Sequence, residues 1–118
     1  MSERDIRDYL SDILDAVTEI KEITKDSENF NSFVQNKEKT YSAIYLLAKI
    51  GEAVKKIPDT IKSNYSQIPW RDISGMRDIL LHEYFRVDLE KIWETIKKDL
   101  DPLKKATEEI LKDAEGRK

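Results

Sequence analysis

Apolar residues recur every three or four positions along most of this chain, and that spacing limits its fold more than any other feature. Within the first 25 residues they form one face of a helix, made of Ile6, Tyr9, Leu10, Ile13, Leu14, Val17, Ile20 and Ile23. Only three glycines and three prolines interrupt the sequence, and no segment alternates between apolar and polar residues as a half-buried strand does. We therefore predict an all-α fold: a bundle of about five main helices in a single domain, residues 1–118.

Polar residues and a proline indicate where the first helices begin and end. Ser2 is the expected N-cap of a first helix that runs to about Lys25, and Asn36 is the expected N-cap of a second long helix. Pro58 ends the second helix, because the residue before a proline avoids the helical conformation. Short helical turns are expected at two places, residues 30–34 and 59–65.

Three more helices are expected in the second half of the chain. The first begins near Trp70 and runs to about Phe85. The next is capped by Asp88 and the last by Asp101. The tail, residues 112–118, is expected to fray.

The second long helix has an apolar face wide enough for more than one neighbour to cover it. Tyr41 and Tyr45 are four residues apart on this face, and we predict that both are in the core. Gly51 lies inside the same helix, where a glycine costs about 1 kcal/mol relative to alanine. A glycine at such a position predicts that another backbone comes close.

Composition argues against several classes of protein. The chain has no cysteine for disulfides or metal binding, and no apolar run near the roughly 20 residues that a membrane-spanning helix needs. A net charge of −3 argues against a general basic coat for nucleic acid but allows a local basic cleft. The N-terminal segment lacks the apolar core of a signal peptide, so we expect a cytoplasmic protein. With a single histidine, neither a metal site nor a cofactor is predicted.

The one histidine lies in the segment RDILLHEYF, residues 77–85. Histidine titrates near neutral pH and can give or take a proton, while arginine stays charged and fits a phosphate. His82 and Arg77 together suit attack by a ribose 2′-hydroxyl on the neighbouring phosphodiester, a route that needs no metal. From spacing alone, ordinary ion pairs on a helix surface are the more frequent use of such residues.

Helical spacing decides how these side chains can meet. Asp78 lies one turn before His82 and could orient the imidazole or favour its charged form. Arg77 and Tyr84 share a face, but Arg77 and His82 point about 140° apart. The long arginine side chain could reach round, the helix could be irregular, or two copies of the chain could form one cleft. We favour the last arrangement, a two-fold homodimer.

Arg77, His82 and Tyr84 form the pattern R-x-x-x-x-H-x-Y, which resembles the motif of the HEPN superfamily. The surrounding sequence is similar to the HepT-like toxin family in the order and spacing of its segments, and the likeness covers most of the chain. These segments are IGEAVKKIP at 50–58, IPWRDISGMRDILLHEYF at 68–85 and VDLEKIWETIKKDLDPL at 87–103.

The resemblance implies a HEPN-type bundle that forms a homodimer and acts as the ribonuclease toxin of a type VII toxin–antitoxin pair. Its substrate would be cellular RNA such as tRNA or mRNA, and the family's catalytic pair maps onto Arg77 and His82. The implied partner is an MntA-like minimal nucleotidyltransferase, the antitoxin, which transfers AMP to the motif tyrosine, here Tyr84. Asp78 stands where the family often has Asn, and a carboxylate is less favourable than an amide beside a phosphate.

Other interpretations of the sequence stay open. The chain could be a non-catalytic binding module that docks a nucleotidyltransferase, or, less in keeping with the motif, an antitoxin whose partner is the toxin. Trp70 and Trp93 are expected to pack in the core or a dimer interface rather than stack on RNA bases. Glu52 is expected to cap or pair inside the bundle rather than act directly in the site.

Overall fold

The computed structural model describes residues 4–82 and 88–116, and the side chains of all of these except 79–82. This part of the chain is helical and contains no strand, which confirms the all-α prediction. The described residues form seven α-helices rather than about five, and the two extra ones, α2 and α4, lie where short helical turns were expected, at residues 30–34 and 59–65. The helices are α1 (Ile6–Thr24), α2 (Phe30–Gln35), α3 (Lys37–Lys55), α4 (Asp59–Lys62), the 3₁₀ turn η1 (Ser63–Tyr65), α5 (Trp70–His82), α6 (Leu89–Lys98) and α7 (Leu100–Gly116).

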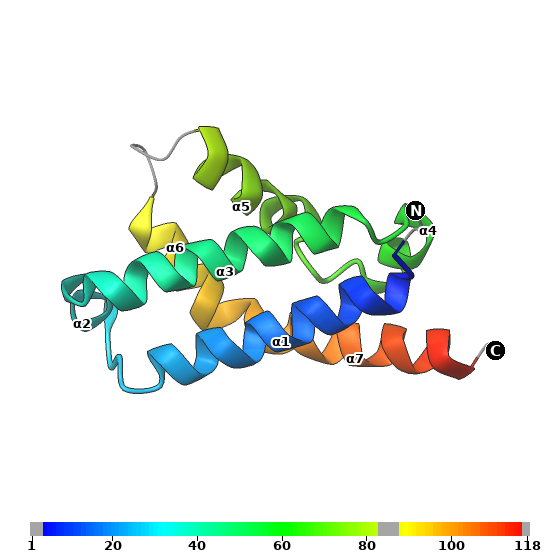
Figure 1. Ribbon diagram of the computed structural model, residues 1–118, viewed down its shortest axis with the longest axis horizontal. Helices are drawn as coiled ribbons and strands as arrows, with labels where there is room; N and C mark the ends of the chain where they lie inside the picture. The colour runs from blue at the N-terminus through cyan, green and yellow to red at the C-terminus, as the bar shows by residue number, and fades with distance from the viewer. Residues whose placement is uncertain (1–3, 83–87, 117–118) are drawn as a thin grey trace.

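The helices form an elongated bundle of 46 × 28 × 27 Å (Figure 1). The two longest helices, α1 and α3, lie side by side, α7 packs on α1, and α5 packs on α3. The apolar faces of these helices, together with those of α2 and α6, meet in one core, which includes Leu10, Ile13, Phe33, Leu47, Ile50, Ile73, Ile92, Leu100 and Leu103. None of the described helices is both long enough and apolar enough to cross a membrane.

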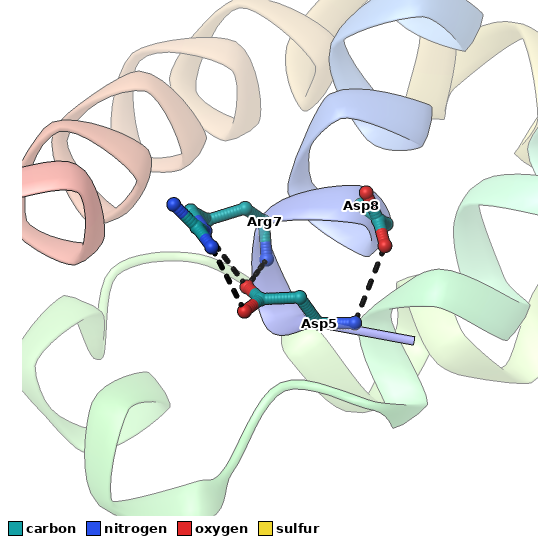
Figure 2. A network of polar contacts seen from close by, with 3 residues as sticks. All are labelled: Asp5, Arg7 and Asp8. Atoms are coloured by element: carbon teal, nitrogen blue, oxygen red, sulfur yellow. Dashed lines mark hydrogen bonds and ion pairs between the residues drawn. The ribbon is translucent and has the colours of Figure 1, made fainter. Parts of the chain in front are cut away.

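The N-cap of the first helix is Asp5, and Ser2, the predicted cap, lies outside the described residues. The Asp5 carboxylate accepts a hydrogen bond from the backbone N–H of Arg7 at 2.8 Å, and the Asp8 carboxylate accepts one from the backbone N–H of Asp5 at 3.2 Å. The Arg7 guanidinium also donates to Asp5 (Figure 2). Together these contacts satisfy N–H groups that the first helical turn leaves without a partner, so α1 begins at Ile6.

Two of the other predicted caps are confirmed, and one is wrong. The Asn36 side chain accepts from the Lys39 N–H, and the Asp88 side chain accepts from the Lys91 N–H, both at 3.1 Å. Asp101 is not a cap, because α7 already begins at Leu100. At the other end, α7 continues through most of the tail that was expected to fray, and ends at Gly116.

The wide apolar face of α3 is confirmed, except at its two tyrosines. Most of its apolar residues are buried, but Tyr41 and Tyr45 are 54% and 58% exposed, so their prediction as core residues is wrong. Both rings lie at the open edge between α1 and α3, where they line a groove with Ile23 and Leu46. An aromatic ring with a hydroxyl end can cover apolar neighbours and still face water, which explains why helical spacing alone misplaced them.

The two tryptophans pack against the core, as predicted. The Trp93 ring lies on Phe33 of α2, with 5.1 Å between ring centroids. The Trp70 indole N–H donates to the backbone carbonyls of Lys62 and Tyr65, at 3.2 and 3.0 Å. These hydrogen bonds join the start of α5 to the α4–η1 segment.

Candidate functional site

Gly51 allows α3 and α5 to touch backbone to backbone. A Cβ atom at this position would lie 2.8 Å from the carbonyl oxygen of Ile73, 3.0 Å from that of Ser74 and 3.1 Å from the backbone nitrogen of Arg77. Each of these distances is shorter than a relaxed van der Waals contact. The predicted close approach at this glycine is therefore confirmed, and the neighbouring backbone is the one that carries Arg77.

This contact brings a carboxylate of α3 beside the arginine of the motif. The Arg77 Nε forms an ion pair with a carboxylate oxygen of Glu52, the residue that follows Gly51. Glu52 therefore pairs within the bundle, as expected from the sequence, but its partner is the proposed catalytic arginine. The Arg77 side chain is 36% exposed and that of Glu52 is 48% exposed, so both groups can be reached from solvent.

Two further charges complete a row across the two helices. The Asp78 carboxylate lies 3.6 Å from Nη1 of Arg77 and 3.4 Å from Nζ of Lys55. Lys55 is one helical turn beyond Glu52 on α3. We call Glu52, Arg77, Asp78 and Lys55 the α3–α5 charge network; its charges alternate in sign and sum to zero.

The position of Asp78 bears on its predicted role. In the structure its carboxylate faces Lys55 and Arg77. The prediction that Asp78 orients the imidazole of His82 remains a prediction, because the His82 side chain lies outside the described ones. His82 itself is the last residue of α5 that the structure describes, and Tyr84 lies outside the described residues.

A guanidinium held at a helix surface is suited to binding a phosphate. Arginine has five N–H donors in a planar fork, and a carboxylate on Nε leaves the donors at the terminal nitrogens for an anion. The described part of the chain contains no group of three or more side chains that could hold a metal ion. What Arg77 offers is electrostatic: a positioned positive charge for an anionic group.

A cleft elsewhere in the molecule is not part of this site. It has a volume of about 400 Å³ and lies between α1, the α4–η1 segment and α7, with Ile6, Ile61 and Ile110 among its apolar lining residues. No residue of the α3–α5 charge network lines it.

Glu52 and Lys55 are the site residues that sequence analysis missed or misjudged. Neither belongs to the R-x-x-x-x-H-x-Y pattern, and their distance along the chain from Arg77 gives no periodic signal. The available clue was Gly51: if a glycine marks where another helix comes close, then the residue after it borders the same contact.

Comparison with known proteins gives a match over most of the chain. The family described as "Ribonuclease HepT-like" matches residues 13–110. A protein named "Putative RNase" from Methanocaldococcus jannaschii is 44% identical over 117 residues, which cover 99% of this chain and 96% of the relative. A "Probable ribonuclease HepT" from Thermococcus cleftensis is 40% identical over 109 residues, or 92% and 98% of the two chains. No solved structure gives a significant match. The resemblance seen in the sequence is thus confirmed, and the chain belongs to the HepT-like ribonuclease family.

Proposed function

We propose that this chain is an endoribonuclease whose chemistry is carried by Arg77 and His82. The observation that carries the proposal is the Arg77 guanidinium, held at the surface of α5 by Glu52 and still open to solvent. The proposal is supported by the family match and by relatives that are named as ribonucleases.

The proposed reaction is a transesterification within the RNA. The ribose 2′-oxygen attacks phosphorus and forms a new P–O bond, while the bond from phosphorus to the 5′-oxygen of the next nucleotide breaks. A proton leaves the 2′-hydroxyl and one is delivered to the departing 5′-oxygen, and imidazole can perform either transfer near neutral pH. Arg77 stabilises the extra negative charge on the phosphate oxygens in the transition state.

The proposed active form is a homodimer. The backbone of α5 is a continuous α-helix through His82, which favours the arrangement with two copies of the chain over an irregular helix. Five residues of regular helix separate their directions by about 140°. A second copy of α5 placed by a two-fold axis would supply His82 opposite Arg77, and Arg77 opposite His82.

The nature of the product ends tests the reaction. We expect the purified protein to cleave RNA in the presence of EDTA, and to leave a 2′,3′-cyclic phosphate on one fragment and a 5′-hydroxyl on the other. Mass spectrometry of the fragments measures both ends. A 5′-phosphate product, or cleavage that stops when EDTA is added and returns with a divalent ion, would contradict this mechanism.

We further propose that the enzyme is the toxin of a toxin–antitoxin pair and that its partner, an MntA-like nucleotidyltransferase, transfers AMP to Tyr84. An AMP group adds bulk and a negative phosphate that Arg77 can bind, so it would exclude RNA from the site. After co-expression with the partner, intact-mass measurement should show an increase of whole AMP units, and the Tyr84→Phe variant should show none.

Two results of that experiment would change the interpretation. Rescue of growth by the partner without any mass increase would mean neutralisation by binding alone. A wild-type protein that binds the partner but cleaves no RNA would instead favour the non-catalytic docking module.

A further inference from the structure

We propose that Glu52 is a positioning residue that fixes the Arg77 guanidinium for its contact with the scissile phosphate. This inference rests on the proposed ribonuclease function and adds a residue from another helix to it. Glu52 lies outside the R-x-x-x-x-H-x-Y pattern, and its contact with Arg77 comes from the packing of α3 on α5.

The geometry favours positioning over an accidental surface contact. Gly51 sets the two backbones in contact, with Arg77 N only 3.1 Å from where a Cβ of Gly51 would be. The carboxylate of the next residue, Glu52, then meets Nε of Arg77. Backbone packing fixes the positions of the Cα atoms of Glu52 and Arg77. The distance that their ion pair must span therefore does not depend on a flexible loop.

An arginine needs such a partner because its side chain is long and rotatable. Holding one rotamer costs conformational entropy. A carboxylate on Nε fixes the plane of the guanidinium before RNA arrives, so that this cost is not repeated when the transition state forms. Asp78 lies 3.6 Å from Nη1, which is beyond hydrogen-bond distance, so the Nε contact with Glu52 is the one that fixes the plane.

The same carboxylate opposes the binding of RNA. Glu52 is half-exposed and would lie close to any phosphate that reaches Arg77, and two negative charges at that distance repel. Removing Glu52 should therefore slow the chemical step while leaving RNA affinity unchanged or making it tighter. Replacing a residue that only supports the fold would lower both the cleavage rate and the RNA affinity, since partial unfolding weakens both.

The experiment measures the two quantities separately. Single-turnover cleavage of a labelled RNA gives the rate of the chemical step, and a fully 2′-O-methylated copy of the same RNA, which cannot be cleaved, gives the dissociation constant. For Glu52→Ala we expect a rate about tenfold lower, the scale of effect that follows from loss of orientation, with a dissociation constant no weaker than that of the wild type. Glu52→Leu, which keeps aliphatic bulk but no acceptor, should behave like Glu52→Ala.

A conservative variant and a matched control complete the set. Glu52→Gln keeps an oxygen that can accept from Nε and removes the charge, so it should recover most of the rate and bind RNA at least as tightly as the wild type. Glu108→Ala removes an exposed carboxylate from α7, a helix that packs on α1 and α6 rather than on α5. It should leave both quantities unchanged.

Two results would overturn the inference. If the rate in Glu52→Ala and Glu52→Leu equals that of the wild type, Glu52 does not position Arg77. If rate and affinity both fall in the Gln, Ala and Leu variants, Glu52 supports the fold or contacts RNA directly. Failure of the proposed function looks different, because the wild-type protein would then cleave nothing or Arg77→Ala would have no effect.

Discussion

Replacing Arg77 or His82 with alanine should lower the rate of RNA cleavage by about a thousandfold, the typical effect of removing a charge-stabilising group or a general acid–base group. For Arg77 the physical reason is the loss of a positive charge that is held in place before the substrate binds. For His82 it is the loss of the only imidazole in the sequence. The measurement is the single-turnover rate with a labelled RNA.

The two substitutions should differ in their effect on binding. Arg77→Ala removes a phosphate contact and should weaken RNA binding, whereas His82→Ala should leave binding nearly unchanged. Arg77→Lys keeps the charge but loses the planar fork, so it should recover only part of the rate. Thermal unfolding of each variant controls for the fold, and a folded Arg77→Ala protein that cleaves at the wild-type rate would remove arginine from the mechanism.

Replacing Gly51 with alanine should have the largest effect on stability. The new methyl group would lie 2.8 Å from the carbonyl oxygen of Ile73, and this oxygen belongs to a helix backbone that cannot turn aside as a side chain can. We expect the free energy of unfolding to fall by about 1–3 kcal/mol, the usual cost of overpacking a core contact. Urea denaturation monitored by circular dichroism measures it.

Gly75 provides the matched control for this prediction. It lies in α5, and a Cβ atom there would meet nothing within 4 Å. Gly75→Ala should therefore raise the free energy of unfolding by about 0.5–1 kcal/mol, because alanine loses less conformational freedom in a helix than glycine does. If Gly51→Ala is as stabilising as Gly75→Ala, then α3 and α5 are not in close backbone contact at Gly51.

Most of the fold could be predicted from the sequence, because where helices form and how they are capped depends on local features. The spacing of apolar residues located the long helices, and Asn36 and Asp88 were correctly identified as caps because an N-cap is decided by residues within one turn. Asp5 is the N-cap in the structure, and both Asp5 and Ser2 are suitable cap residues by type, so the sequence alone did not decide between them. Tyr41 and Tyr45 show a different limit: periodicity tells which residues share a face, but not which part of that face another helix covers.

The candidate site divides in the same way. The spacing of Arg77, His82 and Tyr84 is a local pattern and could be found in the sequence. The pairing of Arg77 with Glu52 depends on how α3 and α5 pack. The sequence therefore predicted that Glu52 pairs inside the bundle but did not identify Arg77 as its partner. Gly51 is different: a glycine is unfavourable inside a helix, and this cost indicated a close contact with a helix distant in the sequence.

The central claim is that an imidazole and a guanidinium of this chain cleave RNA through its own 2′-hydroxyl. The most direct measurement compares wild-type protein and His82→Ala in one cleavage assay that contains EDTA, with thermal unfolding recorded for both. The account predicts cyclic-phosphate products from the wild type and almost none from a His82→Ala protein that is equally stable. Equal amounts of cyclic-phosphate product from the two proteins would contradict it.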